Sequence, residues 1–360
     1  MKATLILEDG HEFKGEALGV LGERIGPVIL NTAVVGYQEM LTDPANAGKI
    51  LVLTYPLIGN YGIAPKFNES SRCWLSGLVI KEKSKIYSNW QAKSSFDKFI
   101  KEQRLLVLSE ADTRTLAVHL RNKGEMLGII STNHANPKEL LAKIEAFRKN
   151  EHKESYLSKI SVNRPTLRRK AGAKYKLAIL DLGITNSIIK QLENLGCALQ
   201  IFPYHTKPQE ILRSQAQGLI ISNGPEDDPG LKEVISNVKE LINKIPMLGI
   251  STGHQVLASA LGAKIAKMKL GHRGLNYPMY HPGSYKAEIT VQNHSSVVDA
   301  DSLRKIKPIK VTGYNLNDHT TEEMESKKLK LIGVQYYPMS PGFDEINDVF
   351  KRFLKMLKEK

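Results

Sequence analysis

The sequence predicts an α/β protein with an N-terminal mixed β/α domain and a C-terminal domain whose mainly parallel sheet is flanked by helices. The first supporting observation is length, because 360 residues exceed one ordinary domain and fit two. The second is composition, since 41% hydrophobic and 24% charged residues are typical of globular chains and exclude disorder, collagen-like repeats and coiled coil as the main state. The third is a change of pattern near residue 174, after which short apolar runs alternate with helical windows.

The N-terminal domain is expected over residues 1–148. Residues 4–8 alternate as a strand does, and Asp9-Gly10 is a tight turn into a second strand that starts at His11. Apolar strands are expected at 28–32 and 50–55, with a polar loop between them. Helices are expected at 113–124, ended by Gly124, and at 137–147, where Asn136 caps a helix that begins with proline.

The C-terminal domain is expected over residues 175–360, after a linker at 149–174 that is rich in charge, serine and proline. Apolar runs and helical windows alternate in it, with strands at 177–181, 199–202, 218–222 and 247–250 and helices at 187–196 and 232–244. Ligands of parallel sheets bind at the carboxyl ends of the strands. The loops that begin at Ser222 and Ser251 are therefore the places where a site is expected.

Charge and cysteine content narrow the class of partner and compartment. The formal net charge is +14, but the lysines are spread along the chain and no nucleic-acid-binding motif is present, so a solvated surface or an acidic protein partner is favoured over nucleic acid. The apolar runs are too short to span a membrane, and acids interrupt the N-terminus before a signal-peptide core. Cys73 and Cys197 are expected to be core residues that form no disulfide framework or metal cluster, which suits a cytoplasmic protein.

The run Gly249-Ile-Ser-Thr-Gly-His-Gln follows a predicted strand and opens an apolar helix. Glycines on both sides of Ser251 are typical of the sharp elbow that lifts a nucleophile above an α/β sheet, next to the backbone N–H groups of a helix N-terminus. The same spacing also fits an ordinary turn in which Ser251 is the helix N-cap. The spacing alone leaves both interpretations open.

Longer motifs carry a resemblance to the small subunit of carbamoyl-phosphate synthetase. The run from Asn31 to Pro44, Leu53-Thr-Tyr-Pro-Leu-Ile-Gly-Asn-Tyr-Gly, Asp112-Thr-Arg-Thr-Leu and Leu120-Arg-Asn-Lys-Gly resemble its N-terminal domain. Its class I glutamine amidotransferase domain is similar to four further runs, which are Ser222-Asn-Gly-Pro, Gly249 to Gln255, Met268 to Pro278 and Gln292-Asn-His. These motifs occur in the family's order over nearly the whole chain.

The resemblance implies a definite activity. In this family the small subunit hydrolyses glutamine with a Cys–His–Glu triad, and the ammonia passes through a tunnel to a large subunit. There it reacts with bicarbonate and two ATP to give carbamoyl phosphate, for pyrimidine and arginine synthesis. The resemblance therefore implies a carbamoyl-phosphate synthetase large subunit as partner, with ATP and magnesium in that subunit and neither cofactor nor metal in this chain.

The sequence departs from the family where the chemistry takes place. The nucleophilic cysteine position is Ser251, the catalytic histidine position is Tyr337, and the position of the glutamate that orients it is Met339. An alcohol needs a positioned base to lose its proton during attack, a phenol with a pKa of about 10 is a poor base at neutral pH, and a thioether cannot hold an imidazole. Losing nucleophile and base together removes several orders of magnitude of activity.

The implied glutamine pocket is altered as well. Gly224, Gln255, Asn293 and the backbone of Thr252 match the family's substrate-binding positions. Four further positions depart from the pattern, namely Ala45 for a serine, Glu226 for a glycine, Ser295 for a glycine and Ser296 for an aromatic residue. A carboxylate and a Cβ at residue 226 intrude where the family's backbone lies against glutamine, so glutamine is a doubtful substrate.

Three functions remain open from the sequence. The first is a carbamoyl-phosphate synthetase small subunit with a silent glutaminase site that serves as a scaffold for ammonia-dependent synthesis. The second is an active glutaminase that uses Ser251 with another base, for which the histidines of the domain are candidates: His254, His272, His281 and His294. The family also has histidines at 254, 272 and 294, which gives them a structural explanation. The third is a stand-alone regulatory or binding protein.

Overall fold

The computed structural model describes residues 1–133, 136–150, 155–339 and 345–358. The chain divides into two compact units. The first comprises Met1–Glu154 together with Lys269–Arg273, and the second comprises Ser155–Met268 together with Gly274–Lys360. Within the described residues, no helix combines the length and the apolar character needed to cross a membrane.

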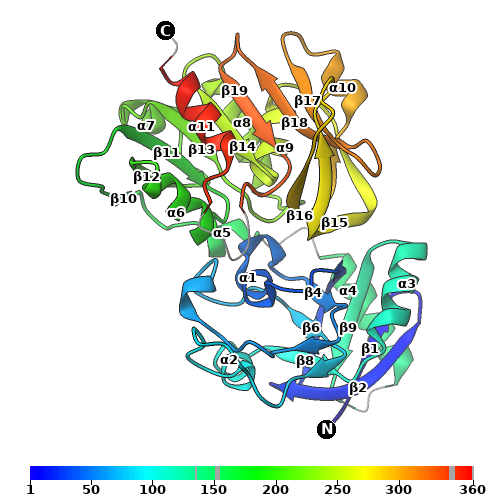
Figure 1. Cartoon of the computed structure of the whole chain (residues 1–360). Helices are drawn as coiled ribbons and strands as arrows, with labels where there is room; N and C mark the ends of the chain where they lie inside the picture. The colour runs from blue at the N-terminus through cyan, green and yellow to red at the C-terminus, as the bar shows by residue number, and fades with distance from the viewer. Residues whose placement is uncertain (134–135, 151–154, 340–344, 359–360) are drawn as a thin grey trace. The chain divides into compact units, whose positions relative to one another are not determined.

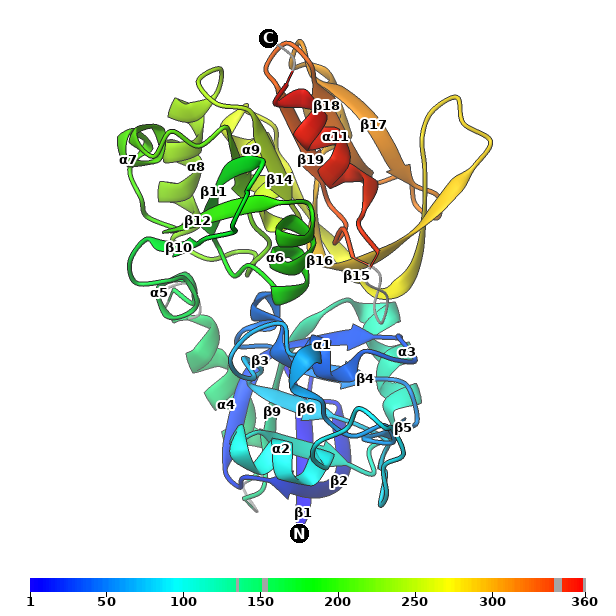
Figure 2. The same ribbon diagram turned by 60° about the vertical axis from the view of Figure 1, so that its left-hand side comes forward.

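The first unit is built on a closed seven-stranded barrel with the strand order β1-β2-β8-β6-β4-β3-β9 (Figure 2). Its strands are β1 (Lys2–Leu7), β2 (Glu12–Gly19), β3 (Glu23–Asn31), β4 (Ile50–Leu53), β6 (Gly77–Val79), β8 (Leu106–Ser109) and β9 (Met126–Ser131). The pairs β3·β4, β4·β6 and β6·β8 are parallel, and the other four pairs are antiparallel. A separate parallel pair joins β5 (Leu57–Ile58) to β7 (Glu82–Lys83).

Helices and turns complete this unit: α1 (Tyr37–Thr42), η1 (Pro44–Asn46), η2 (Pro65–Phe67), α2 (Phe96–Glu102), α3 (Thr113–Lys123) and α4 (Pro137–Arg148). The expected caps are present, because the Asn136 side chain accepts a hydrogen bond from the backbone N–H of Lys138 and Gly124 ends α3 with φ 104°. The segment expected as a polar loop contains α1 and η1. Its Gln38 is fully buried, and the side-chain amide forms hydrogen bonds with the backbone N–H and C=O of Ala64. These bonds allow a polar residue to be buried, so the segment forms a packed helix although its sequence is polar.

The second unit contains a ten-stranded sheet with the order β10-β12-β11-β13-β14-β19-β18-β17-β15-β16. The bounds are β10 (Thr166–Arg168), β11 (Tyr175–Asp181), β12 (Cys197–Pro203), β13 (Gly218–Ile221), β14 (Met247–Ile250), β15 (Ile265–Tyr280), β16 (Ala287–Val298), β17 (Lys310–Asn315), β18 (Thr321–Ser326) and β19 (Leu331–Val334). The five strands from β12 to β19 are parallel neighbours. Strand β10 and the run from β18 to β15 add antiparallel pairs at the two sides.

Helices cover both faces of the parallel strands, which confirms the expected α/β class (Figure 1). One face packs against α7 (Pro208–Arg213), α8 (Leu231–Leu241) and α9 (Thr252–Ala260). The other packs against α6 (Asn186–Asn194) and α11 (Asp348–Met356). The short helices α5 (Leu157–Ile160) and α10 (Ala300–Arg304) add Leu157 and Leu303 to the core of the first face.

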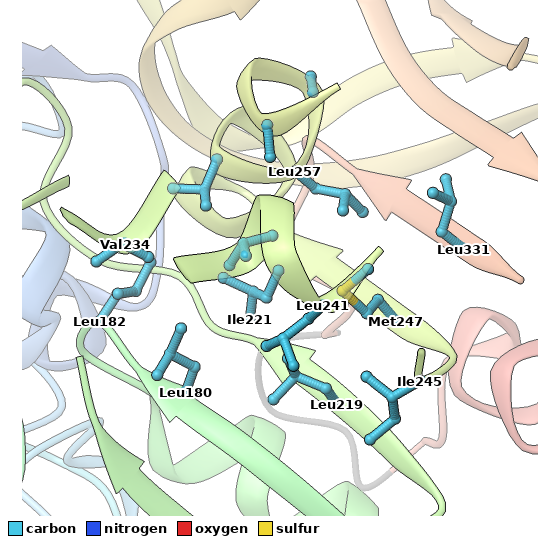
Figure 3. Packing of buried hydrophobic residues seen from close by; sticks show 14 of the residues in the cluster. Leu180, Leu182, Leu219, Ile221, Val234, Leu241, Ile245, Met247, Leu257 and Leu331 are labelled. Atoms are coloured by element: carbon cyan, nitrogen blue, oxygen red, sulfur yellow. The ribbon is translucent and has the colours of Figure 1, made fainter. Parts of the chain in front are cut away.

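Alternation along the strands builds these two cores. Leu180 and Ile221 point to the α8 and α9 side, where Figure 3 shows them with Val234, Leu241 and Leu257. Their neighbours in sequence, such as Ile179 and Ile220, belong to the core on the α6 and α11 side. Burying each such side chain contributes about 1.5–3 kcal/mol.

The expected linker at 149–174 is ordered in its described part, while residues 151–154 lie outside the described residues. The carboxylate of Asp228 accepts hydrogen bonds from the hydroxyl of Ser155 and from the backbone N–H groups of Tyr156 and Leu157. Leu157 is fully buried in the second unit's core, and β10 pairs with β12. Residues 155–174 therefore pack as part of the second unit.

Candidate functional site

Ser251 lies at the sharp turn between β14 and α9, with φ 52° and ψ −111°. This backbone conformation is rare for a residue other than glycine. The flanking glycines are sterically required, because a Cβ on Gly249 would collide with the backbone of Gly253, and a Cβ on Gly253 would collide with the carbonyl of Ile221. The structure thus contains the strand–turn–helix arrangement that the glycine spacing predicts.

The hydroxyl of Ser251 is buried, with 1% of the residue exposed, and has no hydrogen-bond partner among the described residues. It makes no capping hydrogen bond to α9, which removes the interpretation of Ser251 as a side-chain N-cap. A residue in such a backbone region costs about 1–3 kcal/mol. The chain therefore maintains a strained serine whose hydroxyl contributes no hydrogen bond to the fold.

Tyr337 and Met339 follow β19 on the chain. The backbone N–H of Tyr337 donates to the carbonyl of Val291 at 2.8 Å, and its buried phenol oxygen accepts from the side-chain amide of Asn223 at 3.4 Å. The sulfur of Met339 accepts from the hydroxyl of Ser187, near the start of α6, at 3.6 Å. Neither side chain hydrogen-bonds to Ser251.

The other histidines proposed as bases have contacts elsewhere. His294 is buried, with Nδ1 3.0 Å from the carbonyl oxygen of Ser296 and Nε2 3.0 Å from the side-chain oxygen of Gln292. His281 lies after β15, with Nδ1 2.7 Å from the carbonyl oxygen of Thr312. His272 belongs to the stretch Lys269–Arg273 of the first unit.

His254 is fully buried on α9, and neither ring nitrogen has a hydrogen-bond partner among the described residues. Burial disfavours the charged imidazolium and lowers the pKa of His254 to about 3. Such an imidazole stays neutral at physiological pH and accepts a proton poorly. The described structure therefore links no histidine of this unit to the Ser251 hydroxyl.

A carboxylate occupies the position next to the elbow. The side chain of Glu226, on the loop after β13, accepts hydrogen bonds from the Gln255 side-chain amide at 2.6 Å, from the backbone N–H of Ser295 at 2.6 Å and from that of Ser296 at 3.3 Å. The hydroxyl of Thr252 donates to the carbonyl of Gly224 at 2.6 Å, which ties this loop to α9. The Glu226 carboxylate is thus surrounded by Gln255, Ser295 and Ser296.

Two further residues singled out by sequence have simpler environments. Asn293 is half-buried on β16, two positions before Ser295 and therefore on the same side of the strand. Ala45 is buried in η1 of the first unit, where its carbonyl accepts from the Lys49 ammonium at 2.8 Å. A methyl group at residue 45 offers no hydrogen bond to any ligand.

The two thiols are unsuited to replace the missing nucleophile. Cys197 is fully buried at the start of β12, and Cys73 is half-buried against the apolar cluster that includes Leu41 and Phe99. Burial raises the pKa of Cys73 to about 12 and that of Cys197 to about 11, so both remain protonated thiols. Cys197 is a core residue, as the sequence predicts, whereas Cys73 is half-buried at the margin of a core.

One residue of this hydrogen-bonded cluster was not anticipated from the sequence. Gln335 is fully buried just after β19, and its side-chain oxygen accepts from the Gln255 amide at 3.3 Å. The two residues are 80 positions apart, so no local pattern connects them. The available signal was the position of Gln335 at the head of the run that carries Tyr337 and Met339.

Comparisons with known proteins fit this geometry. Residues 5–130 match the family described as carbamoyl-phosphate synthase small chain, CPSase domain, and residues 178–356 match glutamine amidotransferase class-I. The second unit is thus of the class I glutamine amidotransferase type. The whole chain belongs to the carbamoyl phosphate synthase small chain family.

Individual relatives align from end to end. The chain is 37% identical to the carbamoyl phosphate synthase small chain of Syntrophotalea carbinolica, covering 100% of this chain and 98% of that protein. It is 38% identical to the small chain of Clostridium acetobutylicum, covering 99% and 100%. It is 35% identical to the pyrimidine-specific small chain of Bacillus subtilis, covering 99% and 96%.

Proposed function

We propose that this chain is the small subunit of a carbamoyl phosphate synthase, that its own glutaminase site is silent, and that it serves as a scaffold for synthesis from free ammonia. The observation that carries the silent site is the buried hydroxyl of Ser251, which has no base within hydrogen-bonding distance among the described residues. A serine without a base is a weak nucleophile toward a carboxamide. Membership of the family supports the coarser role of small subunit.

The residues at the family's triad positions support the same proposal. Tyr337 uses its phenol oxygen to accept from Asn223, and Met339 contacts Ser187, so neither is placed to take the Ser251 proton. Without nucleophile activation the residual effect of binding and oxyanion stabilisation leaves at most a small fraction of normal activity. The triad positions in this chain have become packing positions.

The scaffold role is supported by the intact fold of both units. Both units retain complete sheets and apolar cores, and the match to relatives runs through both of them. The partner would be the large subunit, which would bind ATP and magnesium, while this chain would carry no cofactor and no metal of its own. The net charge of +14 is complementary to an acidic protein surface on that partner, and its lysines are spread along the chain without a nucleic-acid-binding motif.

The cellular assignment follows from the same proposal. Carbamoyl phosphate is consumed in pyrimidine and arginine synthesis in the cytoplasm, and one relative is named pyrimidine-specific. We place the heteromer of small and large chains in the cytoplasm and in one or both of these pathways.

A second candidate is favoured by one observation. Ser251 keeps the strained elbow conformation, with φ 52° and ψ −111°, that a catalytic nucleophile would need. An active glutaminase that uses this serine would require a base that approaches it only when substrate or the large subunit is bound. A stand-alone regulatory protein is the third possibility, and stable association with a large subunit would argue against it.

The test is carbamoyl phosphate formation by this chain co-purified with its cognate large subunit, supplied with glutamine or with ammonium at matched concentrations. We expect synthesis from ammonium only, and the same rate when Ser251 is replaced by alanine. Comparable synthesis from glutamine, with glutamate released and the rate lost in Ser251→Ala, would overturn the silent site. Failure to co-purify would instead overturn the scaffold role.

A further inference from the structure

The carboxylate of Glu226 is bound as a ligand would be. One of its oxygens accepts from the side-chain amide of Gln255 at 2.6 Å and from the backbone N–H of Ser296 at 3.3 Å. The other accepts from the backbone N–H of Ser295 at 2.6 Å. Hydrogen bonds to an ionised acceptor are short and about twice as strong as neutral ones, so the two bonds at 2.6 Å are the strong contacts of this group.

The three donors form a fixed cradle. Two are backbone N–H groups of adjacent residues on β16, the strand at one edge of the ten-stranded sheet, and the third is on α9. The Gln255 amide has two protons, and its nitrogen lies 2.6 Å from Glu226 and 2.9 Å from the carbonyl oxygen of Ser296, while the side-chain oxygen of Gln335 is the most distant acceptor at 3.3 Å. The second contact therefore holds the amide in the orientation that points its other proton at the carboxylate.

The loop that carries Glu226 is anchored on both sides. Before it, the carbonyl of Gly224 accepts from the hydroxyl of Thr252 on α9. After it, Asp228 is buried and accepts from the backbone N–H groups of Tyr156, Leu157 and Gly230. The carboxylate of Glu226 is thus presented to the cradle by a short, tethered segment.

We infer that Glu226 is a built-in ligand of this pocket: the cradle of Gln255, Ser295 and Ser296 is a site for a small carboxylate, and the chain fills it with its own side chain. The inference rests on the proposed silent pocket, because it explains why free glutamine or glutamate finds no place there. A tethered ligand acts at an effective concentration of millimolar or more, so free amino acids at similar concentrations compete poorly.

Removing the side chain should leave an empty carboxylate site. Glu226→Gly deletes the occupant at a position where relatives tolerate glycine by the resemblance described above, and Glu226→Ala deletes it with a smaller backbone change. The matched control is Asp227→Asn, which removes one negative charge from the adjacent residue while Glu226 remains in the cradle. Asp227 is exposed and has φ 58°, a conformation that asparagine also adopts.

The experiment titrates the full-length chain and its variants with acetate, glutamate and glutamine, and follows heat of binding and thermal midpoint. We expect Glu226→Gly and Glu226→Ala to bind glutamate at least tenfold more tightly than the unmodified chain or Asp227→Asn. We also expect acetate to raise the thermal midpoint of these two variants alone. Saturable glutamate binding to the unmodified chain at the same affinity, or folded variants that bind none of the three probes, would overturn the inference.

The outcomes separate this inference from the proposed function. Binding of glutamine to Glu226→Gly without release of glutamate supports both. Folded variants that bind no carboxylate contradict the built-in ligand and leave the silent triad untouched. Hydrolysis of glutamine by Glu226→Gly would uphold the built-in ligand and contradict the silent triad, because Ser251 would then be working without the family's histidine and glutamate.

Discussion

The imidazole of His254 lies directly against Gly333, so closely that a Cβ on Gly333 would collide with the ring nitrogen Nδ1. This contact places the ring between α9 and the neighbouring strand β19, where it is fully buried. The position explains both the lowered pKa of His254, about 3, and the glycine on β19. It makes His254 a packing residue of the sheet, although it follows Ser251 by only three positions.

The burial of His254 predicts a specific pH dependence of stability. Its pKa is lowered on folding from the ordinary value near 6.5 to about 3, so between these values the unfolded chain binds a proton that the folded chain excludes. The free energy of unfolding should therefore fall as pH falls below about 6.5, by up to about 1.4 kcal/mol per pH unit from this one group. Above that pH the group contributes no pH dependence.

The check is urea unfolding of the chain and of His254→Leu at pH 7, 6 and 5. The leucine variant should lose less stability than the unmodified chain over this range, since it has no proton to take up on unfolding. His205→Gln is the control, because His205 is exposed in the same unit. Equal slopes for His254→Leu and the unmodified chain would mean that the ring is accessible to water and could still act as a base.

A second pair holds α11 to the antiparallel strands. The Arg352 guanidinium contacts both oxygens of Glu323, at 2.7 Å and 3.2 Å, and Glu323 is 1% exposed. Truncating the arginine leaves a buried carboxylate with fewer donors. We expect Arg352→Leu to lower the free energy of unfolding by roughly 2–4 kcal/mol, measured by urea denaturation.

An exposed pair in the same unit provides the comparison. Arg304 and Asp301 are 3.1 Å apart, with side chains 58% and 82% exposed. Water and salt screen such a pair, so Arg304→Ala should change stability by less than about 0.5 kcal/mol. If Arg352→Leu were equally mild, the Glu323 carboxylate would have to be reaching solvent or other donors.

The sequence predicts the parallel part of the second unit well, because its strands and helices have local patterns of apolar residues. The strand and helix expected at 177–181 and 187–196 correspond to β11 (Tyr175–Asp181) and α6 (Asn186–Asn194). Each of these segments buries a regular apolar stripe between two layers, and such stripes are visible in sequence.

The sequence does not predict the antiparallel strands β15 and β16, and the reason is physical. Their first halves are largely exposed, and residues such as Lys267 and Ile289 give no alternation of apolar and polar positions. A strand that lacks one buried face has no periodic signal. Their pairing depends on the sheet to which they attach.

The candidate site also has a part that the sequence predicts and a part that it does not. The glycine spacing around Ser251 predicts the elbow, since the collisions at Gly249 and Gly253 are local. The contact of Glu226 with Gln255 joins residues 29 positions apart, and its contact with Ser295 spans 69. Only the folded sheet brings these groups together, so the sequence could predict an intruding carboxylate but not its donors.

The strained backbone of Ser251 predicts that glycine is the more stable residue at this position. With φ 52° and ψ −111°, Ser251→Gly relieves about 1–3 kcal/mol of strain and removes a buried hydroxyl that has no partner among the described residues. The greater freedom of glycine in the unfolded chain offsets about 0.5–1 kcal/mol of this gain. We expect a net increase of about 1 kcal/mol, seen as a higher thermal midpoint.

Ser251→Ala separates the two contributions, because alanine removes the hydroxyl and keeps the strain. Alanine should therefore give much less of the gain than glycine does. A glycine variant that is less stable than the serine chain would show that the Ser251 side chain makes a contact that stabilises the fold.

Restoring the triad residues one at a time should not restore glutamine hydrolysis until every part is present. Ser251→Cys supplies a thiol, but Tyr337 and Met339 still provide no base, so this single change should leave glutamine hydrolysis at background in the assay of glutamate release. Adding Tyr337→His and Met339→Glu supplies an imidazole and its orienting carboxylate, yet the Glu226 carboxylate would still occupy the Gln255 amide.

The largest increase is therefore expected when Glu226→Gly joins these three changes, as a rise in the rate of glutamate release of at least a hundredfold over Ser251→Cys alone. The matched control is the triple variant Tyr337→His, Met339→Glu and Glu226→Gly, which keeps serine at residue 251. Its rate should be much lower because an alcohol is a poorer nucleophile than a thiolate. Appreciable hydrolysis by Ser251→Cys alone would show that a base already reaches residue 251 in solution, and would return the histidines of this unit to consideration as catalytic groups.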